Sequence, residues 1–232
     1  MTSNTDAAND RSPKAQTTRD QIVAASDRLF YEQGFAATSF ADIANAVEIS
    51  RGNFYYHFKT KDEILAAVIT LRLANTRRML DDWSRDADTP AARIRCFAHI
   101  LIANQAKIML HGCPVGTLSN ELAKLDHDAR GDAGRIFELF RTWLREQFAE
   151  LGCGADADDL ALHLLARSQG ISTLANALRD ADFVAREVAD IATWLDAVAA
   201  RHAPAARVKS RARKAAATTA GDGRRPRAKP RR

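Results

Sequence analysis

The chain has 232 residues, of which 46% are hydrophobic, and a formal net charge of +5 at pH 7. This length allows a small domain and a second domain of ordinary size, and the hydrophobic content supports a real core. No apolar run reaches the roughly 18 residues of a membrane-spanning helix, because polar side chains interrupt the best candidate, residues 97–110.

Both ends of the chain differ from the middle in composition. Residues 1–16 are polar and lack the apolar segment of a signal peptide, so we predict a disordered arm and a cytoplasmic protein that works at the nucleoid. Residues 202–232 hold eleven Lys and Arg against one Asp, a net charge of +10, which leaves −5 for the rest of the chain. We predict a disordered basic tail there. Either it binds DNA without sequence preference through counterion release, or it is a solvated tail without a role.

The first predicted helix covers about residues 18–33. Thr18 and Gln21 have the spacing of a capping box, and apolar residues recur behind them at helical spacing. Gly34 follows, and glycine readily adopts the left-handed conformation that ends many helices.

Two short helices separated by a tight turn come next. Ser39 and Asp42 form a candidate capping box that starts a helix at Phe40, with an apolar stripe along it. Ser50 is a candidate N-cap for a second helix over residues 51–58. Only a turn fits between them, so the segment has the layout of a helix-turn-helix, whose second helix enters the DNA major groove.

The second short helix has two different faces. It is too short to be stable alone, and Phe54 and Phe58, four residues apart, are the predicted anchors. A glycine, two phenols and a cation lie on the opposite face, where the bare backbone permits close approach and the hydroxyls can bond phosphates. Alternatively, the phenols are surface aromatics of an ordinary helical hairpin. The residues of this face are Gly52, Tyr55, Tyr56 and Lys59, with Arg51 at the helix start.

The rest of the chain is also predicted to be helical. Thr60 and Glu63 form a third candidate capping box, at the start of a long helix over residues 61–86. No strand pattern occurs, so we predict an all-α protein of about nine helices. Its predicted parts are a helix-turn-helix domain over 17–62 and a second helical domain over 63–201. The further helices are expected at about 90–110, 114–125, 129–151, 157–179 and 183–201.

The reactive and acidic residues give no sign of an enzyme. Cys96, Cys113 and Cys153 are odd in number and follow no metal-ligand spacing, so neither a disulfide framework nor a metal site is predicted. No phosphate-binding or dinucleotide-binding motif is present, and we predict no cofactor. The acidic residues 156–159 are interpreted as charge at a helix N-terminus.

Residues 17–68 resemble the TetR family of bacterial transcriptional regulators. The resemblance rests on Tyr31-Glu32-Gln33-Gly34-Phe35, on Ile43-Ala44 and on the run from Arg51 to Asp62. One departure is Glu48, where the family usually has glycine in the turn. A non-glycine residue in the left-handed conformation costs about 1 kcal/mol, which is tolerable. The DNA contacts implied by the resemblance are Arg51, Gly52, Asn53, Tyr55, Tyr56, His57 and Lys61, with Thr38 and Ser39 near the DNA backbone.

The last two helices are amphipathic and carry small residues that permit close approach. A pair of such helices from each of two subunits would form a four-helix interface, and the family resemblance implies this homodimer. The alternative is that these helices belong to the core of one chain. The small residues are Ala166, Ser168, Gly170, Ser172 and Ala175.

An effector pocket, if one is present, is expected between the helices predicted over residues 90–151. The stretch 112–118 resembles one branch of the family, in some of which a cysteine senses electrophiles or oxidants. Here Cys113 would sit at a helix N-terminus, which favours a thiolate, with His111 nearby, or it is a small buried hydrophobic residue. The further candidate lining residues, which also fit an ordinary core, are Phe97, Ile100, Leu101, Asn104, Phe140 and Trp143.

The function predicted from these patterns is sequence-specific DNA binding by a homodimeric repressor. Two recognition helices spaced ~34–36 Å apart would bind a pseudo-palindromic operator in double-stranded DNA. A small-molecule effector of unknown identity would release the repressor by moving the helix over 61–86. The alternative is an architectural protein that binds DNA mainly through its basic tail.

Overall fold

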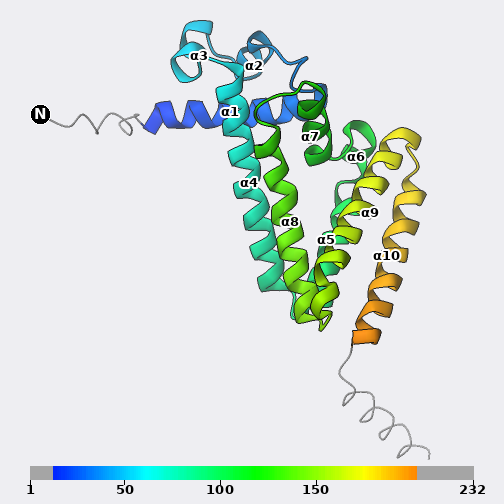
Figure 1. The fold of residues 1–232 in the computed structure, drawn as a ribbon. Helices are drawn as coiled ribbons and strands as arrows, with labels where there is room; N and C mark the ends of the chain where they lie inside the picture. The colour runs from blue at the N-terminus through cyan, green and yellow to red at the C-terminus, as the bar shows by residue number, and fades with distance from the viewer. Residues whose placement is uncertain (1–12, 203–232) are drawn as a thin grey trace, which may run out of the picture.

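The computed structural model describes residues 13–202, and every regular element within that range is helical (Figure 1). The predicted all-α fold is therefore confirmed, while the predictions for residues 1–12 and 203–232 lie outside the described residues. The elements are α1 (Pro13–Gln33), α2 (Phe40–Ala46), α3 (Arg51–His57), α4 (Lys61–Asp86), α5 (Pro90–Ala103), α6 (Gln105–His111), α7 (Pro114–Lys124), α8 (Arg130–Glu150), the short 3-10 helix η1 (Gly154–Asp156), α9 (Ala157–Leu178) and α10 (Ala181–His202).

Two boundaries differ from the prediction. The first helix begins at Pro13 rather than near residue 18, because proline is well tolerated at the first helical position. The described residues form ten α-helices rather than nine, since the helix expected over 90–110 is interrupted at Asn104. The Asn104 side chain donates to the Ile100 carbonyl at 3.1 Å, a local bond of the kind by which asparagine competes with the helix ladder.

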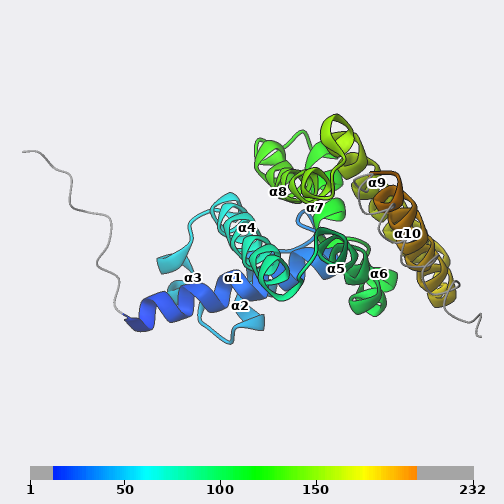
Figure 2. The same cartoon turned by 90° about the horizontal axis from the view of Figure 1, so that it is seen from below.

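The helices divide between two ends of an elongated molecule. Helices α1, α2 and α3 lie at one end, and α4 runs from them into a larger bundle (Figure 1). Within that bundle α8 packs against α4, α7 and α9, while α10 packs against α5 and α9. Seen along the bundle, α9 and α10 lie on the side opposite α3 (Figure 2).

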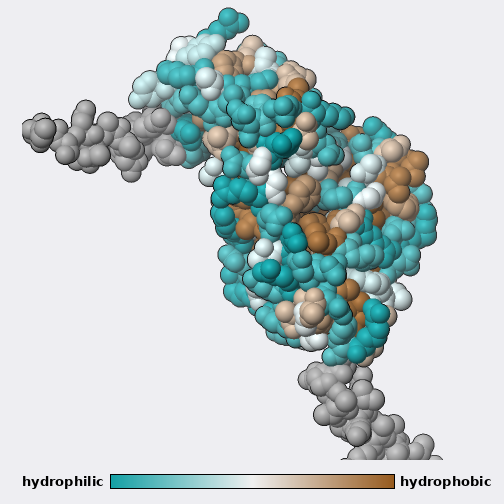
Figure 3. Space-filling view, viewed as in Figure 1, coloured by the Kyte–Doolittle hydropathy of each residue, from teal (hydrophilic) through white to brown (hydrophobic). Residues whose placement is uncertain are grey.

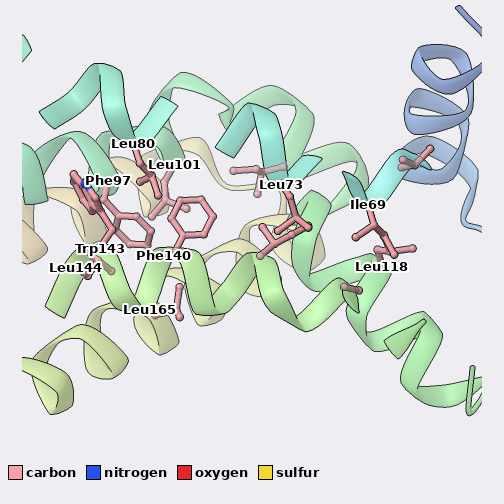
Figure 4. Close-up of a cluster of buried hydrophobic side chains, with 14 of the residues drawn as sticks. Ile69, Leu73, Leu80, Phe97, Leu101, Leu118, Phe140, Trp143, Leu144 and Leu165 are labelled. Atoms are coloured by element: carbon pink, nitrogen blue, oxygen red, sulfur yellow. The ribbon is translucent and has the colours of Figure 1, made fainter. Parts of the chain in front are cut away.

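One hydrophobic core joins both ends. In the bundle, Phe97 and Leu101 of α5 meet Phe140 and Trp143 of α8, with Leu80 of α4 above them (Figure 4). The same cluster of buried residues continues into α1, α2 and α3, so the small end does not have a separate core. A displacement in the bundle can therefore reach the small end through packed side chains. Among the described helices, none combines the length and the apolar character that a membrane span requires.

Candidate nucleic-acid interface and interior cavity

Local capping bonds fix the first half of the helix-turn-helix. The Ser39 hydroxyl accepts the Asp42 amide N–H at 3.2 Å, and the Asp42 carboxylate accepts the Ser39 N–H at 2.8 Å. The predicted capping box is therefore present. Hydrogen bonds from the Ser39 side chain and backbone hold the pKa of Asp42 below its ordinary value.

 The Asp42 carboxylate thus stays ionised at the start of α2, where a negative charge is favourable.

The turn between α2 and α3 uses a left-handed residue that is not glycine. Glu48 has a φ of 56°, as its place in the motif predicted. The turn is closed by two backbone bonds, from the Glu48 N–H to the Asn45 carbonyl and from the Ile49 N–H to the Ala44 carbonyl, each 3.2 Å long. The chain therefore reverses tightly despite the departure from the family pattern.

Helix α3 is held from behind by the two predicted anchors. The side chains of Phe54 and Phe58 are each only 1% exposed. The Phe40 ring packs 5.2 Å from the Phe54 ring, and the Arg19 guanidinium lies 4.5 Å above the Phe58 ring. The Ser50 hydroxyl accepts the Asn53 N–H at 3.3 Å and caps the helix. These contacts fix which face of so short a helix points outward.

The outward face of α3 presents two phenols and an unobstructed backbone. Tyr55 is 45% exposed and Tyr56 is 63% exposed. Apart from its chain neighbours and the backbone of its own helix, no heavy atom lies within 4 Å of the position that a Cβ would take at Gly52, so the backbone is open to a close partner. The Lys59 ammonium donates to the Tyr55 carbonyl at the end of the helix. The other exposed residues of the predicted contact set are Ser39, Arg51 and Asn53.

Three residues of the predicted contact set have side chains engaged within the protein. Thr38 is 1% exposed, and its hydroxyl donates to the Gly34 carbonyl at 2.7 Å. His57 is 6% exposed. The Lys61 ammonium donates to the carbonyls of Phe35 at 2.9 Å, Ala36 at 3.2 Å and Thr38 at 3.2 Å. Thr38 and Lys61 therefore support the loop before α2, and His57 is buried at the end of α3, which their positions in the motif did not indicate.

A carboxylate of the bundle binds the same loop from the other side. Glu121 of α7 accepts the N–H of Phe35 at 2.9 Å and that of Ala36 at 2.8 Å. Gly34 has a φ of 94°, and a Cβ there would lie 3.2 Å from the Glu121 carboxylate. Glycine thus permits the close approach. Sequence reasoning did not find this contact, because its partners lie 86 and 85 residues apart.

A cavity of about 540 Å³ lies in the bundle, next to α1 and α4. Its volume is within the range of small-molecule sites. Trp143 is the one predicted lining residue that does not border it, because its indole N–H donates to the Ser84 hydroxyl at 2.9 Å beside Trp83. The structure brings the other predicted residues together around this space, namely Phe97, Ile100, Leu101, Asn104, His111, Cys113 and Phe140.

One wall of the cavity is polar and connects three helices. Arg72 of α4 is 9% exposed, bonds the Asp27 carboxylate at 2.5 Å and donates to the Pro114 carbonyl at 2.6 Å. The Tyr31 hydroxyl of α1 donates to the Gly112 carbonyl at 2.8 Å. Burial raises the pKa of Tyr31 to about 12, so its phenol remains protonated near neutral pH. Sequence reasoning missed these side chains, since only the fold brings them to the cavity.

The predicted thiol lies in the same wall. Cys113 is the N-cap of α7, and its sulfur accepts the Gly116 N–H at 3.5 Å. The neighbouring His111 ring packs edge to face with the Tyr31 ring at a centroid distance of 5.3 Å. Both residues border the cavity, so a molecule bound there would be close to the sulfur.

The outer surface of α9 carries an exposed stripe, which we call the α9 stripe. Of the small residues noted in the sequence, Ser168, Ser172 and Ala175 are buried in their own chain. The remaining two lie on the exposed side with three leucines at helical spacing. Brown, apolar surface is visible near the turn between α9 and α10 (Figure 3). The α9 stripe consists of Leu162, Ala166, Gly170, Leu174 and Leu178.

The fold and the exposed face of α3 define a helix-turn-helix DNA-binding protein with a second, cavity-containing helical part. Comparison with known proteins assigns this class to a family. Residues 22–68 match the family model of bacterial regulatory proteins of the tetR family. An HTH-type transcriptional regulator from the lacX 3′ region of Lactococcus lactis is 31% identical over 139 residues, which are 59% of this chain and 70% of the relative. The chain belongs to the TetR family of transcriptional regulators, which is not a family of enzymes.

Further relatives and solved structures agree with this assignment. The HTH-type transcriptional repressor DhaR of Mycobacterium sp. strain GP1 is 30% identical over 122 residues, which are 52% of this chain and 60% of DhaR. A TetR regulator from Chloroflexus aurantiacus has the same fold, with a TM-score of 0.71 at 24% identity, covering 80% of this chain and 97% of that one. The reduced form of Escherichia coli NemR has a TM-score of 0.68 at 18% identity, covering 75% and 95%.

Proposed function

We propose that this protein is a homodimeric repressor that binds a pseudo-palindromic operator through α3 and is released by a small molecule in the cavity. The observation that carries the proposal is that α1 and α4 contact both the recognition helix α3 and the cavity. They hold the back of α3 through Arg19 and the buried core, and they border the cavity through Tyr31 and Arg72. The relative DhaR is itself named a repressor.

The proposed DNA-binding surface is the exposed face of α3 with the start of α2. Arg51 and the phenols of Tyr55 and Tyr56 would contact the duplex, and Gly52 would let the backbone approach it. Thr38, His57 and Lys61 would contribute indirectly, by holding in place the loop and the helix that carry these groups. In this description residues 17–62 form the DNA-binding part and residues 63–201 the effector-binding and dimerisation part.

A homodimer would supply the second recognition helix. The α9 stripe is exposed and apolar, and the two last helices are adjacent, so two copies could form a four-helix interface. A pair of α3 helices would then reach two successive major grooves ~34–36 Å apart.

The segment between α6 and α7 provides a route from the cavity to the DNA-binding surface. Tyr31 and Arg72 bind the carbonyls of Gly112 and Pro114 on the cavity side, and Glu121 at the other end of α7 binds the loop before α2. A ligand that displaces the segment would move α7 and, through Glu121, that loop. Coupling of ~1–3 kcal/mol is enough to change operator occupancy strongly.

Substitution of α3 tests the DNA-binding surface. An operator is first selected from random duplex DNA with the full-length protein, and affinities are then measured by gel shift. Arg51→Ala should weaken operator binding by about 1–3 kcal/mol because it removes a contact to bases or phosphates. Arg77→Ala on the exposed side of α4 removes the same charge elsewhere and should have little effect. Equal affinities for both variants would remove α3 from the interface.

The alternative of an architectural protein is supported by the charge of the tail, which lies outside the described residues. A chain ending at His202 distinguishes the two functions. Our proposal expects sequence-specific binding to survive with a shallower salt dependence, because fewer phosphates are neutralised. Loss of nearly all binding would favour the architectural function.

We also propose that Cys113 makes release sensitive to electrophiles. Addition of N-ethylmaleimide would join the sulfur to one alkene carbon and leave the thiol proton on the other. The adduct would occupy the cavity wall beside Gly112 and Pro114 and should lower operator affinity. Cys113→Ser should abolish this loss, whereas Cys96→Ser should not. An identical response in all three proteins would exclude Cys113 as the sensing residue.

A further inference from the structure

The cavity is lined by charges that already neutralise one another. Arg72 and Asp27 form one pair at 2.5 Å, and Arg28 and Glu32 form another at 3.1 Å. The remaining charged side chain of the lining is that of Lys107, which is exposed. Apart from Lys107, the Asp, Glu, Lys and Arg residues of the lining are therefore paired with an opposite charge within the described residues.

Each nitrogen of the buried guanidinium already donates one hydrogen bond, so three of its five N–H groups are used. Arg72 donates through Nε to the Asp27 carboxylate, through one Nη to the Pro114 carbonyl, and through the other Nη to the Asp27 carbonyl at 3.4 Å. A bound carboxylate would have to share the single Arg72 charge with Asp27, which would leave two carboxylates on one cation. Such sharing is unfavourable because the excess negative charge in a poorly hydrated site is costly.

The other walls offer apolar surface and uncharged hydrogen-bonding groups. Phe97, Leu101 and Phe140 line one side, from α5 and α8. Thr76 is 8% exposed and lines the cavity one turn after Arg72 on α4, and none of its described neighbours forms a hydrogen bond with its hydroxyl. Gln169 of α9 also borders the space, where its amide makes a single long bond of 3.5 Å to the Ser168 hydroxyl.

We propose that the effector is an uncharged, mainly apolar molecule with at least one hydrogen-bonding group, such as a ketone, and that carboxylates and amines are excluded. This inference rests on the proposed function of the cavity as the effector site. The apolar body packs against the α5 and α8 side, and the polar group bonds Thr76 or Gln169. The pairing of Arg72 with Asp27 determines the preference for a neutral ligand.

Three naphthalene compounds of similar shape test the inference: 2-acetylnaphthalene, 2-naphthoate and 2-(aminomethyl)naphthalene. Binding to the full-length protein is measured at neutral pH by isothermal titration calorimetry. We expect the ketone to bind at least about tenfold more tightly than either charged compound. Equal or tighter binding of the acid or the amine would overturn the proposal, and so would a failure of the ketone to bind.

Two matched substitutions test the role of the ion pair. Asp27→Asn leaves the Arg72 charge uncompensated and should improve the affinity of naphthoate relative to the ketone by about tenfold. Asp82→Asn makes the same chemical change in the exposed pair with Arg85, which does not border the cavity, and should leave the order unchanged. An unchanged ratio in folded Asp27→Asn protein contradicts the inference. If that variant does not fold, Thr76→Val supplies the test, because it should weaken the ketone by about fivefold or more, and an unchanged affinity would count against the proposed site.

Operator binding separates failure of this inference from failure of the proposed function. Gel shifts without any compound report only the DNA-binding surface. If Arg51→Ala leaves operator affinity unchanged, the proposed DNA-binding surface is wrong, whatever the affinities of the three compounds. A protein whose operator binding depends on Arg51 but which prefers naphthoate keeps its proposed function and loses only the assigned ligand class.

Discussion

At the scale of single residues, the loop before α2 depends on two oppositely charged side chains. Lys61 binds three of its carbonyls, and Glu121 binds two of its amide N–H groups. Backbone polar groups that leave water must be paired, and charged partners make strong hydrogen bonds. The position of α2, and through the tight turn that of α3, therefore depends on side chains outside the recognition helix.

Replacing Lys61 with methionine should destabilise the protein rather than only weaken DNA binding. The substitution removes three bonds from the loop and should lower the free energy of unfolding by about 1–3 kcal/mol, as expected for hydrogen bonds to a charged group. Lys59→Met is the matched control, since Lys59 is exposed and bonds only the Tyr55 carbonyl. Urea denaturation of both variants measures the difference. Equal stabilities of the two variants would favour a direct DNA contact for Lys61.

At the scale of elements, the short-range signals in the sequence are sufficient to predict the helix-turn-helix. The Ser39 capping box, the Ser50 cap and the start of α4 after Thr60 all involve partners three residues apart. The third capping box was only half right, because Glu63 accepts the Lys59 N–H at 2.8 Å instead of that of Thr60. Local chemistry fixes such contacts, so one sequence reveals them.

The turn at Glu48 carries strain that glycine would relieve. A left-handed φ of 56° is unfavourable for glutamate, at a cost of about 1 kcal/mol or more. Glu48→Gly should therefore raise the free energy of unfolding, although the flexibility of glycine in the unfolded chain limits the gain to about 1 kcal/mol or less. Thermal unfolding followed by circular dichroism measures the change.

Ala46, two positions before Glu48, provides a control of opposite sign. Ala46 is the last residue of α2 and is exposed, so Ala46→Gly should destabilise the protein by about 0.5–1 kcal/mol. If both glycine variants lower the melting temperature, the left-handed turn is not a source of strain.

At the scale of the whole molecule, sequence reasoning placed most of the cavity but not its polar wall. Helical spacing brings Phe97, Leu101 and Phe140 to one side of their helices, which is enough to suggest a shared interior. The contact of Arg72 with Asp27 spans 45 residues and that of Tyr31 with Gly112 spans 81. Nothing in the local pattern identifies such partners, because they meet only after α1, α4 and α7 have packed together.

The α9 stripe leads to a prediction about assembly. Leu174 is 47% exposed on α9, and Leu174→Glu would place a carboxylate in the proposed dimer interface, where burial of an unpaired charge is costly. We expect this variant to be largely monomeric by analytical ultracentrifugation and to lose operator affinity. Leu125→Glu makes the same change at a leucine that is 48% exposed at the end of α7, and it should remain dimeric. A dimeric Leu174→Glu protein would contradict the interface.

The last prediction concerns how the two ends of the molecule communicate. Through the carboxylate of Glu121, α7 accepts hydrogen bonds from the Phe35 and Ala36 amides. A glutamine side chain has one accepting oxygen and no charge, so it cannot replace both bonds. In Glu121→Gln, exchange of these two amide hydrogens should therefore speed up by about tenfold or more, and operator affinity should fall while the protein remains dimeric. Hydrogen–deuterium exchange with gel shifts measures both effects. Glu32→Gln alters a surface ion pair of the neighbouring helix and should change neither. If Glu121→Gln weakens amide protection but leaves operator affinity intact, the loop before α2 does not position α3, and the route from the cavity to DNA must run through α4 alone.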